Sequence, residues 1–502
     1  MDAAFDTVVA GAGSAGAALA ARLSEDPAHH VLLVEAGPDL GPRNQLPAAI
    51  LDARSATTDY DWGYQSEPDH AGRSIPLPRA KLVGGCSATN AVFALRGSPS
   101  DYDQWAGLGN DGWSFAGVLP FFRALETDLD FDDEWHGHDG PIAIQRVPVD
   151  GLREHQRAAL EAAWALGHPP VVDHNRPGAV GAGPLPRNAP GDERLSTALA
   201  YLAPAGTRPN LTVRADTLVD RVLLAGTRAQ GVLLANGEQI TADHVVLAAG
   251  AYGSPTILMR SGIGPARHLA ALGIGVAADL SGVGTALVDH PMLSVIVPTL
   301  PSSDGRWFEA AITWRSTLAG DDPYDMHTIP GGPITVTPDE SPTGNILFLF
   351  SSVMRPRSRG RVTLRSTNPV DPPRIRTGGL NHPDDLARMI EAVQHTRELF
   401  RTGPLRELVC GDELTPGPAA QAHDELAAAV QANTTVYHHA CGTCPMGPDP
   451  DAGAVVDPTG RVHGIDGLVV ADASIMPAIP AANTNLPTIM LAERIAHLLR
   501  SA

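Results

Sequence analysis

The N-terminal segment DTVVAGAGSAGAALAARL constrains the fold more than any other part of the chain, because it places three glycines between a short apolar strand and a helix. Gly11, Gly13 and Gly16 have G-x-G-x-x-G spacing. This spacing permits a tight turn, lets a pyrophosphate approach the backbone and allows the helix to pack closely. The helix N-terminus supplies free N–H groups and a positive dipole end for the phosphates. The segment predicts a dinucleotide-binding unit.

A second predicted strand, VLLVEA at 31–36, ends in an acidic residue. Glu35 lies 19 residues after Gly16, close to the interval of ~20 residues at which such units place a ribose-binding carboxylate. A glycine pattern alone is often an ordinary turn, but the order strand, glycines, helix, strand and acid favours the nucleotide site. It does not distinguish FAD from NAD.

Composition excludes several classes of partner. The formal net charge of the 502 residues is −20, and a surface of this sign repels nucleic acid and anionic membranes. No apolar run reaches the ~18 residues that a membrane span needs. The chain enters its first strand without a signal-peptide pattern, and four cysteines do not form a disulfide scaffold. A cytoplasmic location is expected, and the oligomeric state is not readable.

Three further motifs follow in a fixed order: RAKLVGGCSATN at 79–90, GAYGSPTILMRSGIG at 250–264, and HHACGTCPMG with NTNLPT near the C-terminus. Together with the N-terminal segment they resemble the glucose–methanol–choline (GMC) flavoprotein oxidoreductases over nearly the whole chain. The branches that it resembles are the choline-dehydrogenase-like members and the aryl-alcohol and hydroxymethylfurfural oxidase-like members.

This resemblance implies an α/β protein with two domains. A Rossmann-like FAD-binding domain comprises residues 1–145, 190–290 and 426–502. A substrate-binding domain comprises residues 146–189 and 291–425 and is built on a mostly antiparallel sheet with helices. The segments SVIVPTL, NILFLFSSV and RVTLRS read as strands, and 385–400 reads as an amphipathic helix.

The resemblance also implies that FAD is the cofactor. Thr89 stands where some family members carry a histidine bonded to the flavin, so FAD is expected to be non-covalent. The resemblance implies that the backbone of Val222 contacts the adenine, but a plain sheet valine explains this residue equally well. The cofactor-binding residues implied are Gly11, Gly13, Ser14, Ala15, Gly16, Glu35, Ala36, Arg79, Gly84, Gly85, Ser87, Asn90, Ala91, Val222, Asp472, Ala473, Asn483 and Thr484.

The family pattern of His, two residues and Gly-Thr places the catalytic histidine at His439 rather than His438. The second catalytic position, His or Asn in the family, matches Asn485. A neutral imidazole is a suitable acceptor for an alcohol proton near pH 7. An amide N–H directed at the same oxygen stabilises its developing negative charge.

The implied function is FAD-dependent oxidation of a primary alcohol to an aldehyde. Hydride passes to flavin N5, His439 acts as base, and oxygen or another acceptor takes the electrons. Aromatic and small polar alcohols both stay open as substrates. The alternatives are GMC-fold lyase chemistry, flavin photodecarboxylation, or a non-catalytic flavin-binding protein.

Some features leave two interpretations open. Cys441 and Cys444 form a C-x-x-C, typical of a redox pair or half a zinc site, but no second pair follows and no metal is expected. The segment 301–340 is either a loop over the active site or a disordered surface excursion. Ser254 and Pro255 predict a helix start.

Five aromatic residues of the predicted substrate-binding domain either line a pocket or belong to the core: Trp307, Phe308, Trp314, Phe348 and Phe350.

Overall fold

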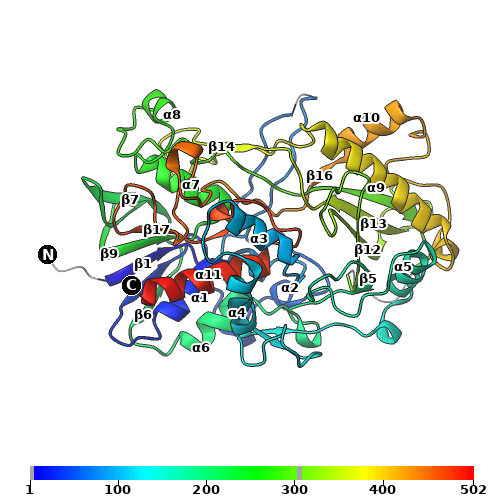
Figure 1. Cartoon of the computed structure of the whole chain (residues 1–502), viewed down its shortest axis with the longest axis horizontal. Helices are drawn as coiled ribbons and strands as arrows, with labels where there is room; N and C mark the ends of the chain where they lie inside the picture. The colour runs from blue at the N-terminus through cyan, green and yellow to red at the C-terminus, as the bar shows by residue number, and fades with distance from the viewer. Residues whose placement is uncertain (1–4, 70, 302–307, 502) are drawn as a thin grey trace.

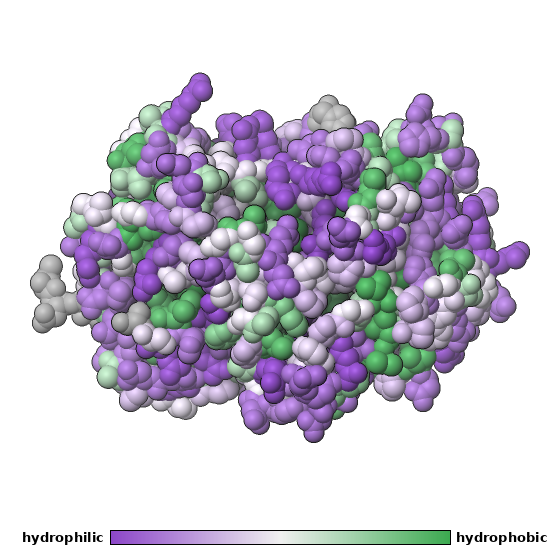
Figure 2. Space-filling model, viewed as in Figure 1, coloured by the Kyte–Doolittle hydropathy of each residue, from purple (hydrophilic) through white to green (hydrophobic). Residues whose placement is uncertain are grey.

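A computed structural model describes residues 5–69, 71–301 and 308–501. Two sheets lie side by side along the long axis of the molecule, each with its own helices (Figure 1). One sheet is mostly parallel and the other is antiparallel, so the predicted α/β class with a Rossmann-like sheet and a second antiparallel sheet is confirmed. Polar side chains dominate the face drawn in Figure 2, with apolar groups scattered among them.

The first sheet has seven strands in the order β6-β2-β1-β9-β8-β7, with β17 paired to β9. Five strands run parallel to one another, namely β6, β2, β1, β9 and β17. β8 is antiparallel to its neighbour β9, and β7 is antiparallel to β8. An Asn-Gly turn at Asn236 and Gly237 joins β8 to β9, and Gly237 has a φ of 89° there. The strands are β1 (Phe5–Ala10), β2 (Val31–Val34), β6 (Leu211–Arg214), β7 (Val219–Ala225), β8 (Arg228–Leu234), β9 (Gln239–Leu247) and β17 (Leu468–Val470).

Helix α1 (Ser14–Leu23) begins directly after the glycine turn and packs against the C-terminal helix α11 (Asn485–Arg500) (Figure 1). A Cβ on Gly16 would lie 1.8 Å from the carbonyl oxygen of Gly11, so only glycine permits this approach of helix and turn. The other helices of this part are α2 (Ala48–Leu51), α3 (Pro99–Gly107), α4 (Phe115–Leu125), α6 (Ala203–Ala205), α7 (Gly250–Arg260) and α8 (Ala266–Ala271).

The second sheet has six antiparallel strands in the order β16-β10-β13-β12-β11-β5. Its strands are β5 (Gly181–Pro184), β10 (Pro291–Pro298), β11 (Ala310–Trp314), β12 (Met326–Thr335), β13 (Asn345–Val353) and β16 (Thr435–Val436). Its helices are α5 (Glu154–Ala165), α9 (Pro383–Arg401) and α10 (His423–Asn433).

Side chains alternate between the two faces of the second sheet, as the two-residue period of a strand requires. Leu293 and Val295 of β10 join the core with α5 and α9. Met292 of β10 and Phe348 and Phe350 of β13 pack in a different cluster on the opposite face. That face is turned toward the first sheet and forms one wall of the site described below.

The predicted domain boundaries stay a prediction, and strand pairing crosses them. β16 comes from the segment assigned to the FAD-binding domain, yet it pairs with β10 of the second sheet. The hairpin of β14 (Arg361–Thr363) and β15 (Arg374–Arg376) packs with Tyr252 of α7, next to the first sheet. A further short pair is formed by β3 (Glu126–Asp128) and β4 (Ile142–Ile144).

The expected start of the helix at Ser254 and Pro255 is wrong, because α7 begins at Gly250. A carboxylate from a distant segment supplies the cap: Asp472 Oδ2 accepts the N–H of Gly250 at 2.8 Å and the hydroxyl of Ser254 at 2.5 Å. This tertiary partner satisfies the helix N-terminus five residues earlier than local sequence indicates.

Segment 301–340 forms β11 and β12 in its described part, so it is neither a lone loop nor a surface excursion there. Trp307 lies outside the described residues. Trp314 belongs to the core beneath the second sheet, where its ring stacks on His395 at a centroid distance of 4.3 Å.

Within the part of the chain that the structure describes, no helix combines the length and apolar character of a membrane span.

Candidate active site

A cavity of about 690 Å³ joins the glycine turn of the first sheet to the aromatic face of the second. Its wall is formed by the β1–α1 turn, the loop at 85–93, the start of α7, residues 437–440 and residues 483–485. Sixteen of the twenty predicted site residues line it: Gly11, Gly13, Ser14, Ala15, Glu35, Ala36, Arg79, Gly85, Asn90, Ala91, His439, Asp472, Ala473, Asn483, Thr484 and Asn485.

Four predicted cofactor residues do not line this cavity. Gly16 and Gly84 serve the backbone packing around it. The hydroxyl of Ser87 donates to the carbonyl of Gly84 at 2.6 Å and faces Thr197, so it holds the loop from inside. Val222 lies within the sheet, where its N–H donates to Ser261 Oγ. Val219 of the same strand reaches the cavity in its place.

At one end of the cavity, the Glu35 carboxylate is held between two backbone N–H groups. Oε2 accepts from Ala12 and Oε1 from Gly37, both at 2.9 Å. Burial raises the pKa of this carboxyl. The position after β2 is where a parallel nucleotide-binding sheet meets a ribose, so the geometry fits the interpretation made from the sequence.

The two glycine loops touch one another beside this end. A Cβ on Gly85 would lie 2.6 Å from the Cα of Gly13, and Gly85 has a φ of 50°. The N–H of Gly84 donates to the carbonyl of Ala12 at 2.8 Å. Because neither loop carries a side chain at the contact, the backbone of both is left open to a phosphate-bearing ligand.

His439 lies at the other end of the cavity, and three groups hold it. Its backbone N–H donates to Asp289 Oδ1 at 2.8 Å. Its ring Nδ1 lies 2.9 Å from Nδ1 of His290, and its Nε2 lies 3.1 Å from Nδ2 of Asn483. Burial lowers the pKa of His439 well below the ordinary value, so the imidazole is neutral near pH 7 and can accept a proton.

The carboxamide beside His439 is that of Asn483, which corrects the expected pairing with Asn485. Asn485 is the first residue of α11, and its Oδ1 accepts the hydroxyl of Ser14 at 2.8 Å. It therefore faces the glycine turn and ties α11 to α1. Asn483 precedes the helix, and its Oδ1 has no partner among the described residues.

His438 also faces the cavity, although it does not take the position of His439. Its φ of 66° is uncommon for a residue with a side chain. The backbone on either side is fixed, because Tyr437 N–H donates to the carbonyl of His290 and His439 N–H to Asp289. The left-handed residue thus lets neighbouring histidines both line the wall.

Apolar side chains form the wall opposite the glycine turn. Phe308 contacts Phe348 and Phe350 edge-on, at centroid distances of 6.2 and 5.8 Å. Phe93, Met292 and the ring of Tyr437 complete this wall. Phe308, Phe348 and Phe350 therefore belong to the pocket, as one of the two interpretations expected, whereas Trp314 belongs to the core.

Sequence reasoning missed Asp289, His290 and Tyr437. These residues acquire their places only through the pairing of β10 with β16, where Pro291 opposes Val436. No local pattern around 288–291 indicates that partner.

Cys441 and Cys444 are fully buried and do not line the cavity. Burial raises the pKa of the Cys441 and Cys444 thiols, which disfavours the thiolate needed for redox exchange or zinc binding. Cys86 does line the cavity.

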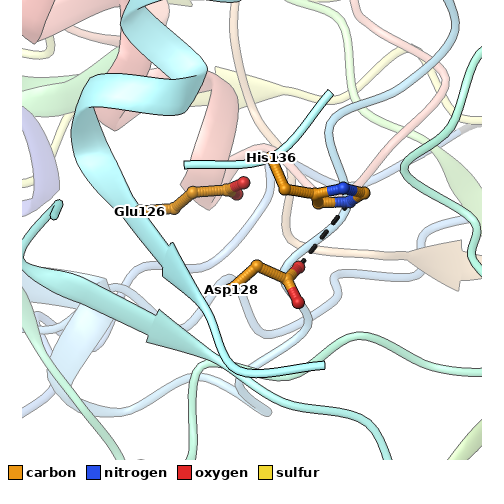
Figure 3. A group of neighbouring side chains, drawn as sticks. All are labelled: Glu126, Asp128 and His136. Carbon is orange, nitrogen blue, oxygen red and sulfur yellow. Dashed lines mark ion pairs between the residues drawn. The ribbon is translucent and has the colours of Figure 1, made fainter. Parts of the chain in front are cut away.

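One other cluster in the described residues has the residue types of a metal site: Glu126, Asp128 and His136, which converge in Figure 3. Arginines already compensate it, because Arg96 pairs with Glu126 and Arg146 with Asp128. Its geometry is that of a buried ion-pair network, and the absence of a metal stays a prediction.

Comparisons with known proteins agree with these features. Two family profiles, both described as GMC oxidoreductase, match residues 5–292 and 356–492. An oxygen-dependent choline dehydrogenase of Brucella ovis is 37% identical over 536 residues, covering 98% of this chain and 95% of the relative. A crystal structure of pyridoxine 4-oxidase from Mesorbium loti has a TM-score of 0.91 at 31% identity and covers 99% of both chains. An FAD-dependent oxidoreductase from Chaetomium thermophilum has a TM-score of 0.87 at 26% identity, again covering 99% of both.

The contact between the glycine loops gives a direct test of the nucleotide site. Gly85→Ala places a Cβ against Gly13 and is expected to weaken FAD binding at least about tenfold, a loss of about 1.4 kcal/mol. Gly107→Ala is the matched control, since a Cβ there meets nothing within 4 Å. The measurement is FAD titration of the apoproteins by flavin fluorescence. Equal affinities in the two variants would contradict the assignment.

Proposed function

The chain belongs to the glucose–methanol–choline oxidoreductase family, and on this premise we propose that it is an FAD-dependent enzyme that oxidises a neutral primary alcohol to an aldehyde, with His439 as the general base. The observation that carries the proposal is the position of His439 Nε2, next to the Asn483 amide in a cavity continuous with the glycine turn.

The residues present fit FAD. The paired glycine loops leave backbone exposed for the pyrophosphate, and Glu35 lies where a ribose binds. Ala249 to Gly253 at the start of α7 and Asp472 line the stretch between that end and His439. When bound, FAD supplies the hydride acceptor for the alcohol carbon.

His439 and Asn483 divide the work on the alcohol oxygen. His439 Nε2 takes the hydroxyl proton, so an N–H bond forms as the O–H bond breaks. The Asn483 amide N–H stabilises the negative charge that develops on this oxygen without competing for its proton. The apolar wall of Phe93, Phe348 and Phe350 keeps water from the reacting atoms.

The lining of the second sheet favours aromatic or apolar alcohols over small polar ones. Among the described residues, the cavity wall contributed by β10 and β13 consists of Met292, Ser294, Phe348 and Phe350, with no charged side chain. Aromatic faces can also bind a quaternary ammonium group, but no charged side chain of the described strands β10 and β13 lies on this wall to offset the desolvation of a cation. Although the curated relative is named a choline dehydrogenase, this wall supports a neutral substrate.

The electron acceptor is oxygen or another oxidant, and the name of the Brucella relative, oxygen-dependent choline dehydrogenase, supports oxygen. The alternatives are lyase chemistry, photodecarboxylation and a non-catalytic flavin protein. The retained pair of base and amide donor favours alcohol oxidation over all three.

Substitutions at the base and at the two asparagines test the assignment of roles. His439→Ala is expected to lower the rate of anaerobic flavin reduction by at least about 10², with FAD still bound. Asn483→Ala is expected to lower it by about 10²–10³, as for an oxyanion donor. Asn485→Ala is the control and is expected to stay near the wild-type rate. Stopped-flow absorbance of the flavin measures all three, and a large loss only in Asn485→Ala would restore the original pairing.

The choice of substrate is testable with two alcohols of opposite character. Anaerobic benzyl alcohol is expected to bleach the flavin spectrum, whereas choline is expected to bleach it far more slowly, because no charged group of the β10–β13 wall offsets desolvation of the cation. Faster bleaching by choline would overturn the neutral-substrate proposal. Bleaching by neither would favour the alternative functions.

We also propose that FAD is held without a covalent bond, since Thr89 occupies the cavity wall where a linking histidine would stand. Denaturation of the holoprotein in trichloroacetic acid is expected to release all of the yellow chromophore into the supernatant. Yellow colour retained in the washed precipitate would contradict a non-covalent cofactor.

A further inference from the structure

The imidazole of His439 is hydrogen-bonded to a second imidazole that lies behind it. His439 Nδ1 and His290 Nδ1 are 2.9 Å apart, and the ring planes are nearly perpendicular, at 86°. His290 Nε2 lies 3.1 Å from the carbonyl oxygen of Met354. Three groups therefore form one chain of hydrogen bonds, which ends at a backbone carbonyl.

The backbone carbonyls of Met354 and Pro480 both lie near the His290 ring, and the contact of Nε2 with Met354 at 3.1 Å sets the direction of the bonds in this chain. A carbonyl oxygen only accepts, so His290 Nε2 carries a proton and donates it to Met354. His290 is fully buried, and burial lowers its pKa to about 3. The ring is therefore neutral, and its Nδ1 holds a lone pair.

The lone pair on His290 Nδ1 then decides the state of His439. At 2.9 Å, a second lone pair on His439 Nδ1 would repel it, so His439 Nδ1 carries the proton and donates. Because His439 is also neutral, its Nε2 is unprotonated. The Asn483 amide, which donates to Nε2 at 3.1 Å, agrees with this from the opposite end.

The backbone around His290 makes this arrangement rigid. The carbonyl of His290 accepts the N–H of Tyr437 at 2.9 Å, and the carbonyl of Pro291 accepts Ser352 Oγ at 2.7 Å. Asp289 accepts the backbone N–H of His439. The dipeptide Asp289–His290 thus holds both the backbone and the ring of His439.

We infer that His290 is a positioning residue, which holds His439 in the tautomer with its proton on Nδ1 and its lone pair on Nε2. The Asn483 amide contacts this lone pair here, and the lone pair becomes free for the alcohol proton when the amide donates to the alcohol oxygen instead. The inference rests on the proposed role of His439 as base. A neutral imidazole in this place orients the base without adding the opposite charge that a carboxylate would add. The imidazolium formed after proton transfer is therefore less stabilised, and the proton is released readily.

The tautomer can be observed apart from activity. In the FAD-bound protein labelled with ¹⁵N-histidine, NMR at pH 7.5 is expected to show His439 with a pyrrole-type Nδ1 and a pyridine-type Nε2, assigned by the signals lost in His439→Gln. The opposite tautomer in the wild-type protein would overturn the inference, whatever the rates. If wild-type His439 carries its proton on Nδ1 as expected but His439→Ala reduces the flavin at the wild-type rate, the result would contradict the proposed function and not the tautomer.

Two substitutions separate positioning from a purely structural role. His290→Asn keeps an acceptor near the Nδ1 position and is expected to retain most of the flavin reduction rate. His290→Gln keeps a donor toward Met354 but removes the acceptor near the Nδ1 position. Its flavin reduction rate is expected to fall by between about 10-fold and 10⁴-fold, and the upper figure is the cost of a wrong tautomer in a Ser-His-Asp triad.

For both variants the dissociation constant of the alcohol in stopped flow is expected to stay near the wild-type value, because His290 does not line the cavity. Equal rates in the two variants, or a loss confined to alcohol binding, would overturn the inference. If either variant fails to bind FAD, the tautomer of the wild-type protein decides the question.

Discussion

The segment 436–446 is the constraint on which the site depends, because hydrogen bonds tie it to both halves of the molecule. On one side, Cys441 exchanges two backbone hydrogen bonds with Val288, at the approach to β10. On the other, the N–H groups of Gly442 and Cys444 donate to Ala473 and Ser474, just after β17 of the nucleotide sheet. The proposed base, His439, is carried on this segment and is therefore held at a fixed place relative to both the glycine turn and the aromatic wall, as proximity catalysis requires.

Local sequence was sufficient where the structure obeys local rules. The glycine turn, α1, β2 and Glu35 lie in consecutive residues, so spacing alone predicts their arrangement. The alternation of β10 and β13 and the amphipathic helix α9 follow in the same way. His439, identified through the resemblance, lies in the cavity.

The remaining features depend on partners far away in the chain. Asp472 moves the start of α7 to Gly250, and no local signal in 250–264 reveals it. Asn483 and Asn485 are two residues apart and chemically identical, but only the second is inside α11, where it meets Ser14. His290 is adjacent to His439 because β10 pairs with β16. Motif matching identifies the segment that carries α7 and the segment that carries Asn483 and Asn485, but not His290, and in all three cases tertiary packing selects the residue.

The cavity combines two glycine loops suited to a phosphate-bearing cofactor with an uncharged wall from β10 and β13. The glycine loops and Glu35 line the part of the cavity proposed for FAD, whereas Met292, Phe348 and Phe350 of the second sheet line its apolar wall. Selectivity in such a pocket comes from shape and desolvation rather than from charge pairing.

The central claim is that His439 Nε2 and Asn483 Nδ2 bind one alcohol oxygen. A crystal structure of the reduced holoprotein with benzyl alcohol tests it most directly. We expect the alcohol oxygen to lie about 2.6–3.2 Å from His439 Nε2, with the Asn483 amide donating to the same oxygen. An alcohol whose oxygen contacts His438 or Asn485 instead would contradict it.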